Sequence, residues 1–327
     1  MSHPATPSSA AIVIIGGPTA SGKTAAAIAL ARKLDAQGQK PVIINADALQ
    51  LYRDLRVISA RPSAEEEAAA PHRLYGVMDG AERGSVASWL EQAREEIETA
   101  LDSGWRPILV GGTGMYLHTL MNGLALVPEI SPDVRADAVT THATLGGRAF
   151  RQELAKLDPL GAAKLHDGDT QRLIRYYEVV KGTGRPLADW QSEPQDRPPA
   201  HWNFVCFVTE PARPVLYAQC DSRFDAMLAE GARDEVTALL ARNLNPDLPV
   251  MKAVGVPEIA AMIRGDWTLS MAREKAQQAT RNYAKRQLTW FRHQLPQAYR
   301  LDTSTLKQPG ERDKLAEAMH AIVQKAL

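Results

Sequence analysis

The sequence predicts an α/β protein in which a parallel sheet is flanked by helices and interrupted by a helical insertion. Short apolar runs rich in β-branched residues alternate with helical segments, a pattern typical of parallel sheets that helices cover on both faces. A glycine-rich motif occupies residues 17–24, between the first apolar run and the first helix. From about Gly123 to Pro199 the strand signals vanish and helical stretches dominate.

The first part of the chain contains three apolar runs, each expected to be a buried strand. Ala11 to Ile15 (AIVII) is continuous and β-branched, and an alanine-rich helix is predicted from Lys23 to about Leu34. Such alternation favours a parallel sheet with right-handed connections. The other elements predicted here are strands at 42–45 and 107–110 and a helix at 91–101.

The second part of the chain begins with the insertion and then returns to the sheet. Helices are predicted at 133–157 and 169–180 within it, and the run FVCFV at 204–208 restores a buried strand. Long helices are predicted at 213–240 and 271–294. We therefore expect an α/β core in two pieces, residues 11–122 and 201–327, with a helical subdomain at 123–200.

Composition excludes several classes of protein. The 327 residues are 45% hydrophobic and 23% charged, and Lys plus Arg equals Asp plus Glu at 38 each, so evidence for a nucleic-acid partner must come from local clusters of charge. Cys206 and Cys220 alone make no zinc site and favour a reducing compartment. Residues 1–10 lack the basic region of a signal peptide, and no apolar run approaches the roughly 20 residues of a membrane span. We expect a cytoplasmic protein without a membrane segment, and no obligatory protein partner is evident.

The glycine-rich motif fits G-x-x-x-x-G-K-[ST], the P-loop pattern, so the predicted core is P-loop NTPase-like. Its glycines let backbone N–H groups close around phosphate oxygens, and the start of the next helix adds a favourable dipole. Lys23 offers a point charge, and Thr24 can ligate Mg²⁺. The candidates for phosphate binding are Gly17, Thr19, Ala20, Ser21, Gly22, Lys23 and Thr24.

A carboxylate and a second glycine-rich turn follow the next two strands. Asp47 comes directly after the strand at 42–45, at the edge where open α/β sheets place their sites. It can hold Mg²⁺, act as a general base or cap a turn, and the neighbouring P-loop makes the capping role less favoured. The turn Gly111 to Gly114 can present backbone donors and the Thr113 hydroxyl to an anion, although such turns favour glycine for many reasons.

The helix predicted near the end of the chain is basic. On a helix, Arg281, Lys285 and Arg292 fall within roughly 40° of one another, with Tyr283 and Trp290 on the other side. A basic stripe near aromatic residues suits a phosphate backbone or an RNA strand. A solvated face with core aromatics behind it explains the same pattern equally well.

Taken together, these motifs resemble the tRNA dimethylallyltransferase family, also called tRNA isopentenyltransferases. The resemblance covers roughly residues 11 to 300. Because seven motifs occur in the right order, it is far more specific than any one of them. The motifs are GPTASGKT (17–24), the D-x-x-Q-x-Y of Asp47, Gln50 and Tyr52, SARP (59–62), PHRL (71–74), VGGTGMY (110–116), DTQRL (169–173) and TRNYAKRQLTWFR (280–292).

The resemblance implies transfer of a dimethylallyl group from its diphosphate to N6 of the adenine immediately 3′ of the anticodon. The P-loop, with Lys23 and Thr24, would hold the diphosphate and its Mg²⁺. Asp47 would be the general base, while Arg223 and Thr113 would steady the diphosphate as it leaves. The residues implied near the tRNA are Gln50, Asp169, Gln171, Arg172, Arg281, Lys285 and Gln287.

The sequence departs from the family pattern at three places. Ala48 stands where the family usually has Ser, Val256-Pro257 replaces the usual Tyr-Arg, and Gln219 stands where an Arg often precedes Arg223. These departures concern RNA affinity or substrate range, because none touches the P-loop, Asp47 or Thr113. The chain also lacks the cysteines of the zinc finger in the longer eukaryotic form, so it resembles the short bacterial form.

Other functions share some of these features. An enzyme that prenylates free AMP, ADP or ATP has the same P-loop and base, but the insertion and the basic helix favour a polymeric substrate. A small-molecule kinase would place a nucleoside triphosphate in the P-loop and use Asp47 to activate a hydroxyl. A nucleotide switch that binds RNA without catalysis is disfavoured, because the sequence has no N-K-x-D motif for guanine.

Overall fold

The computed structural model describes residues 10–192 and 196–326. Its contacts divide these residues into two compact units, which we describe separately. The first unit comprises residues 10–121 and 199–326, and the second lies between them, from 122 to 198.

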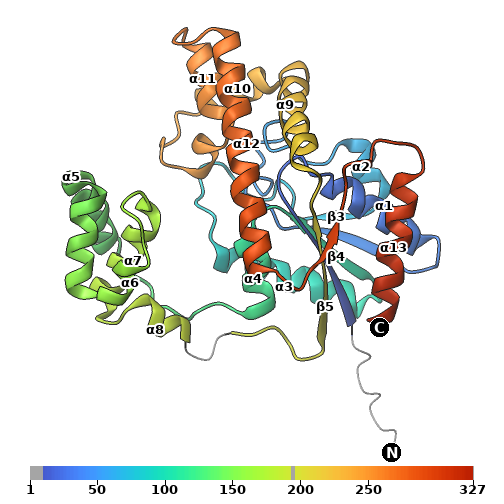
Figure 1. The fold of residues 1–327 in the computed structure, drawn as a ribbon, viewed down its shortest axis with the longest axis horizontal. Coiled ribbons are helices and arrows are strands. Elements are labelled where there is room, and N and C mark those ends of the chain that lie inside the picture. The colour runs from blue at the N-terminus through green and yellow to red at the C-terminus, as the bar shows by residue number, and fades with distance from the viewer. Residues whose placement is uncertain (1–9, 193–195, 327) are drawn as a thin grey trace, which may run out of the picture. The chain divides into compact units, whose positions relative to one another are not determined.

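The first unit is built on one six-stranded sheet in which every neighbouring pair of strands is parallel (Figure 1). The strand order is β3-β2-β4-β1-β5-β6, so the first strand lies inside the sheet and pairs with β4 and β5. This confirms the predicted α/β fold with a P-loop-like parallel sheet. The strands are β1 (Ala10–Gly16), β2 (Pro41–Asn45), β3 (His72–Arg73), β4 (Arg106–Gly111), β5 (Trp202–Thr209) and β6 (Tyr299–Leu301).

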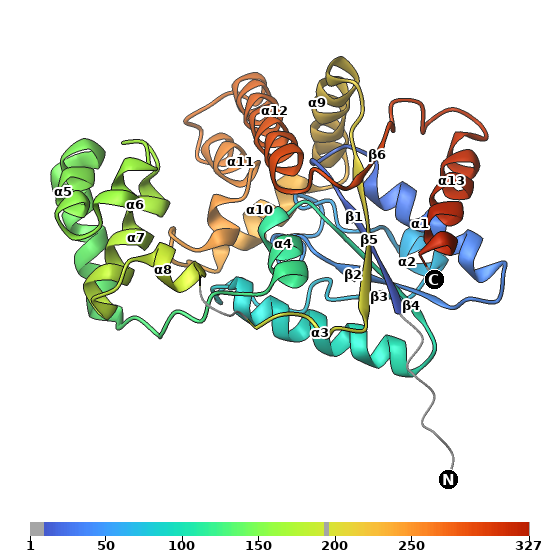
Figure 2. The same ribbon diagram turned by 60° about the horizontal axis from the view of Figure 1, so that its bottom comes forward.

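Helices cover both faces of the sheet. Successive residues of a strand point to opposite faces, and in the central strands both sets are buried. Val13 and Ile15 of β1 pack with α1 (Lys23–Asp35) and with Met319 and Val323 of α13 (Glu311–Lys325). On the other face lie α3 (Val86–Asp102) and α4 (Gly114–Asn122) (Figure 2). The remaining helices of this unit are α2 (Ala64–Ala69), α9 (Arg213–Ala229), α10 (Ala232–Ala241), α11 (Val256–Ile263), α12 (Leu269–Gln294) and a short 3₁₀ helix at Pro249–Lys252.

Two predicted helices differ from the observed ones. The helix predicted at 213–240 is two helices, because α9 ends at Ala229 and α10 begins at Ala232. Gly231 between them has a φ of 102°, a conformation that a helix interior does not accept. The helix predicted at 133–157 is interrupted at Gly146, which has a φ of 74° and a ψ of 163°.

The second unit is helical in its described residues, with its own apolar core. Phe150, Leu154, Leu173 and Tyr177 are among the side chains that fill it. Its helices are α5 (Pro132–Leu157), α6 (Pro159–Ala163), α7 (Thr170–Thr183) and α8 (Leu187–Ser192).

One buried charge in the second unit is held by two arginines. The carboxylate of Glu178 is 1% exposed and accepts hydrogen bonds from Arg135 at 3.0 Å and from Arg175 at 2.7 Å. Both arginines keep much of their side chains in solvent, so the pairing orients two cations at the surface of the unit.

In neither unit is a described helix long and apolar enough to cross a membrane.

Candidate active site

The P-loop connects β1 to α1 at the carboxyl edge of the sheet, and its own hydrogen bonds determine which groups it can offer to a phosphate. The Ser21 hydroxyl donates to Pro18 O at 2.8 Å and lies 2.5 Å from the Thr209 hydroxyl. Thr303 in turn donates to Ser21 O at 2.7 Å. Because the Ser21 side chain is 1% exposed and used in these bonds, only its backbone N–H can face an anion.

The backbone of the P-loop is shaped for an anion. Ala20 has a φ of 61° and Gly22 a φ of 83°, so the loop turns its N–H groups inward before α1 begins at Lys23. A side chain at Gly17 would put its Cβ 2.1 Å from the Thr209 hydroxyl, which is why glycine is required there. The first amides of α1 add the positive end of the helix dipole.

Lys23 lies inside this loop and near two other charged groups. Its Nζ donates to Pro18 O at 2.6 Å. Burial lowers the pKa of Lys23 to about 8, with a smaller upward effect from Asp47 and a further lowering by Arg223. A negatively charged ligand beside Lys23 would favour its protonated form.

Asp47 is held at the end of β2 by Asn45 and by the turn after β4. The Asp47 N–H donates to Asn45 Oδ1 at 2.8 Å, and Asn45 Nδ2 donates to Asp47 O at 3.0 Å. Within the carboxylate, Oδ1 accepts the N–H of Leu49 at 3.1 Å. The N–H of Ala48 donates to the Thr113 hydroxyl oxygen at 2.9 Å. The predicted base and Thr113 therefore belong to one hydrogen-bonded unit, and position 48 contributes to it through its backbone.

Arg223 reaches the P-loop from α9. Its Nη1 donates to the Thr19 hydroxyl at 3.3 Å. Burial lowers the pKa of Arg223, while the nearby Asp47 carboxylate raises it. Lys23, Asp47 and Arg223, which are far apart in the sequence, are therefore electrostatic neighbours.

Gln287 links the two glycine-rich turns. Its Oε1 accepts the N–H of Thr19 at 2.8 Å, and its Nε2 donates to Gly112 O at 2.9 Å. The side chain is 7% exposed, and a Cβ on Gly112 would come within 2.4 Å of its Nε2. Gln287 thus lies beside the site as the family resemblance implies, but both ends of its amide bind the protein.

A cavity of about 870 Å³ lies at the carboxyl edge of the sheet, and the predicted site residues Gly17, Thr113 and Gln287 are not among the residues that line it. Gln50 lines it and donates to Ser59 O and Ala60 O, each at 3.0 Å. Thr19, Ala20, Ser21, Gly22, Lys23, Thr24, Asp47, Gln219 and Arg223 also line the cavity. Four further cations in its wall, Arg56, Arg61, Lys307 and Arg312, were not predicted as site residues.

Sequence reasoning could have found only some of these cations and supports. Arg61 belongs to the SARP motif, whereas Lys307 and Arg312 carry no motif and reach the cavity because α13 returns to α1. Glu235 of α10 accepts the N–H groups of Arg56, Val57 and Ile58, at 2.7, 2.7 and 2.9 Å. Nothing in the local sequence indicates this contact with the cavity wall.

The predicted basic stripe of α12 is divided by ion pairs. Arg281 pairs with Asp221 at 2.5 Å, and Arg292 pairs with Glu210 at 2.5 Å. Lys285 is exposed and lines a separate recess of about 600 Å³ on α12. Asn282, Arg286, Thr289, Trp290, His293 and Gln294 line the same recess.

The remaining predicted tRNA residues lie in the second unit. Asp169 precedes α7 and accepts the N–H of His166 at 3.2 Å, while Gln171 and Arg172 are exposed. The Arg172 guanidinium lies 3.9 Å from the Asp169 carboxylate. Asp169 and Arg172 therefore lie together near the start of α7, and Gln171 is exposed on the same turn. Val256 and Pro257, the third departure from the family, form the start of α11.

The residues that the structure describes include no group of three or more His, Cys, Asp or Glu side chains able to hold a metal. The oxygen groups that line the cavity include the Thr24 hydroxyl and the carboxylates of Asp47, Glu66 and Glu230. Mg²⁺ commonly takes one or two protein oxygens and completes its shell with water and substrate phosphates. This donor set therefore fits a magnesium ion bound together with a diphosphate.

Comparison with known proteins gives a single family. The family model described as IPP transferase matches residues 50–294. A tRNA dimethylallyltransferase of Rhodospirillum centenum is 51% identical over 90% of this chain and 93% of its own, and one of Rhodospirillum rubrum is 51% identical over 94% and 93%.

Solved structures agree with this assignment. The full-length tRNA isopentenylpyrophosphate transferase of Bacillus halodurans is 30% identical, with a TM-score of 0.68 over 97% of this chain and 98% of its own. A eukaryotic dimethylallyltransferase acting on tRNA shares the fold, with a TM-score of 0.80 at 24% identity over 98% of this chain and 81% of its own. The chain belongs to the IPP transferase family.

Proposed function

We propose that the protein transfers a dimethylallyl group from dimethylallyl diphosphate to N6 of the adenine immediately 3′ of the anticodon in tRNA. The observation that carries this proposal is the meeting of a P-loop, an arginine and a carboxylate in one cavity. Lys23 and Arg223 suit a departing diphosphate, and Asp47 suits removal of a proton. Membership of the IPP transferase family, with relatives named for tRNA, supports the acceptor. A tRNA substrate implies that the protein acts in the cytoplasm.

The donor end of the cavity would hold the diphosphate. Backbone N–H groups of residues 20–24 and the side chains of Lys23 and Arg223 would bind its oxygens. Both cations are partly desolvated, so their attraction to the charge that develops on the leaving diphosphate is stronger than in water. The Thr24 hydroxyl would hold Mg²⁺, which neutralises negative charge on the diphosphate when bound.

The acceptor end would hold the adenine. The lone pair of N6 attacks the allylic carbon, the bond from that carbon to the diphosphate oxygen breaks, and both electrons leave with the diphosphate. The proton lost from N6 passes to Asp47, whose backbone N–H and carbonyl are held by Asn45, while Thr113 accepts the N–H of the next residue, Ala48. Because the adenine belongs to a stem-loop, it must be unstacked to enter the cavity.

Two surfaces of the protein suit the tRNA. Residues 123–200 would bind the anticodon stem-loop, with Asp169, Gln171 and Arg172 on the exposed surface near the start of α7. The recess on α12 offers Lys285 for phosphate and Trp290 for stacking.

The test is transfer of radiolabel from dimethylallyl diphosphate, with Mg²⁺, to an anticodon stem-loop that has three adjacent adenines. We expect label in the stem-loop and release of diphosphate, and chelation of the metal should reduce both. Labelling of AMP but not of the stem-loop would instead indicate a free-nucleotide prenyltransferase. Phosphate release from ATP without prenyl transfer would indicate a kinase.

The role of Asp47 has its own test. The Asp47→Ala variant should lose transfer and retain binding of inorganic diphosphate, because the P-loop is unchanged. Undiminished turnover in this variant would exclude Asp47 as the base.

A further inference from the structure

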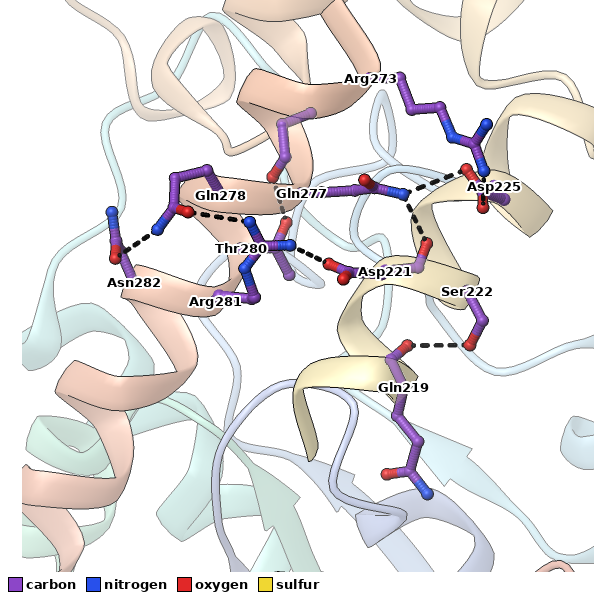
Figure 3. Close-up of polar contacts among 11 residues, drawn as sticks. Gln219, Asp221, Ser222, Asp225, Arg273, Gln277, Gln278, Thr280, Arg281 and Asn282 are labelled. Carbon is purple, nitrogen blue, oxygen red and sulfur yellow. Dashed lines mark hydrogen bonds and ion pairs between the residues drawn. The ribbon is translucent and has the colours of Figure 1, made fainter. Parts of the chain in front are cut away.

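A ladder of polar contacts joins α9 to α12 (Figure 3). Arg281 pairs with Asp221 at 2.5 Å, and Arg273 pairs with Asp225 at 2.5 Å. Between these pairs, Gln277 Nε2 donates to Asp221 O and to Asp225 Oδ1, each at 3.3 Å. We call these five residues the α9–α12 ladder.

The ladder and the cavity occupy opposite sides of α9. At about 100° per residue, Arg223 projects roughly 160° to 200° away from Asp221 and Asp225. The residues of α9 that line the cavity, Gln219, Ser222, Arg223, Ala226 and Met227, form a single stripe on that opposite side. Any rotation of α9 that breaks the ladder therefore moves Arg223 relative to the P-loop.

The contact between the two helices also includes a small apolar cluster. The apolar cluster shared by α9 and α12 has Leu216, Cys220 and Ala284 as its buried members. Two of these three side chains are small, so the area that they bury is modest. In addition, Arg223 and Lys23 carry like charges, and each lies close enough to affect the site electrostatically. The Asp47 carboxylate attracts both cations, so the place of Arg223 depends on Asp47 as well as on the position of α9.

The guanidinium of Arg281 forms its hydrogen bonds within the protein. Its Nη1 donates to Asp221, its Nη2 donates to Gln278 Oε1 at 2.8 Å, and its side chain is 22% exposed. Two of its five N–H donors are therefore used within the protein, and its charge is paired with that of Asp221. Lys285, one turn further along α12, is exposed, so its ammonium group can contact an RNA phosphate.

We propose that Asp221, Asp225, Arg273 and Arg281 are positioning residues that hold α9 so that Arg223 reaches the diphosphate site. The proposal rests on the proposed function, because it assigns these residues to the donor rather than to the RNA. It also replaces the role near the tRNA that the family resemblance implies for Arg281.

The experiment is a double-mutant cycle read by the binding of inorganic diphosphate in the presence of Mg²⁺. Asp221→Asn and Arg281→Gln should each weaken binding by about tenfold to a hundredfold, because small displacements of a positioned group have effects of this size. In an Arg223→Gln background the same changes should cause little further loss, because the ladder acts through Arg223. A full additional loss in that background would overturn the proposal.

RNA binding separates this role from a contact with tRNA. Stem-loop affinity measured at several salt concentrations should be unchanged by Asp221→Asn and Arg281→Gln, whereas Lys285→Gln should weaken it and lower the salt slope by about one. A reduced salt slope for Arg281→Gln, without any effect of Asp221→Asn on diphosphate, would assign Arg281 to the RNA instead.

Two further variants complete the test. Arg264→Gln removes an exposed ion pair with Asp266 and is the matched control, expected to bind diphosphate as the wild type does. If a single variant fails to fold, the exchange Asp221→Arg with Arg281→Asp restores the pair in reverse and should recover binding, and no recovery in a folded exchange variant counts against the ladder. Because diphosphate binding is read without prenyl transfer, failure of the proposed function and failure of the ladder give different results.

Discussion

The side-chain amide of Asn45 holds the backbone of Asp47 at both of its polar ends, accepting its N–H at 2.8 Å and donating to its carbonyl at 3.0 Å. The same Nδ2 donates to Leu74 O at 3.0 Å. Asn45 is completely buried, and its own carbonyl accepts the Trp89 indole N–H at 2.9 Å. The position of the proposed base thus depends on a neutral residue two positions earlier in the chain.

We expect Asn45→Ala to slow transfer by about tenfold to a hundredfold, because the carboxylate loses its fixed position. The free energy of unfolding should fall by about 1–3 kcal/mol, since the buried N–H of Asp47 and the carbonyl of Leu74 lose their partner. Single-turnover rates with saturating donor and stem-loop, together with urea unfolding, measure the two effects.

Asn203→Ala is the control for this change. Asn203 lies near the start of β5 and donates to Ala326 O at 2.7 Å, so it is a half-buried amide at the opposite edge of the sheet from Asp47. The Asn203→Ala variant should have a lower free energy of unfolding and an unchanged single-turnover rate of transfer. An Asn45→Ala variant that turns over at the wild-type rate would show that the base needs no such support.

Gln287 is expected to act through the P-loop rather than on the RNA. Its amide joins Thr19 N to Gly112 O, so Gln287→Ala should loosen both turns and raise the KM for dimethylallyl diphosphate by about tenfold. Stem-loop affinity, measured by fluorescence anisotropy without donor, should stay within about twofold of the wild type. Gln294→Ala, in the exposed recess of α12, should show the reverse pattern. Equal loss of both substrates in Gln287→Ala would favour direct contact with the adenine.

Glu235 is expected to stabilise the wall of the cavity. Its carboxylate accepts three consecutive N–H groups, at residues 56–58, and Arg56 and Arg61 line the cavity just beyond. Glu235→Ala should lower the free energy of unfolding by about 1–3 kcal/mol and raise the donor KM. Thermal unfolding and steady-state kinetics measure these effects, and Asp234→Ala, at the exposed neighbouring position of α10, is the control. A variant with lowered stability and unchanged donor KM would show that this wall does not contribute to donor binding.

The two cysteines should be unreactive in the native protein. Burial raises the pKa of Cys206 to about 12 and that of Cys220 to about 11, above the ordinary value of about 8.5. At pH 8 the native thiolate fraction should therefore be at least about a hundredfold lower than in the unfolded chain, and iodoacetamide should label both thiols only in denaturant.

The sign of the linked effect on stability follows from the same shifts. Because the thiols ionise first in the unfolded chain, their contribution to stability is complete below about pH 8.5 and is lost as the pH rises towards 11. Alanine at both positions should remove this part of the pH dependence in urea unfolding. Rapid native labelling at pH 8 would contradict the prediction.

The sequence by itself determined the fold class and the chemistry at the ends of the strands. The apolar runs at β1, β2, β4 and β5 are long enough to be recognised, and the P-loop pattern and Asp47 lie next to them. Strands β3 and β6 have two and three residues, so they carry no periodicity and are set only by pairing with β2 and β5. Gly231 is an isolated glycine with no turn signal around it, whereas Gly146 is followed by Gly147, a pair that favours a break in a helix.

Only the tertiary structure decided which polar groups meet. The basic residues of α12 look alike in sequence, yet Arg281 pairs with Asp221, Arg292 pairs with Glu210, and Lys285 is exposed. The acidic partners of Arg281 and Arg292 lie about 60 and 80 residues away in the sequence, and no local sequence pattern predicts such a pairing. A motif fixes the chemistry of a side chain because that chemistry is local. The partner that the side chain binds depends on how distant segments pack, and this packing separates a residue that positions α9 from one that is open to RNA.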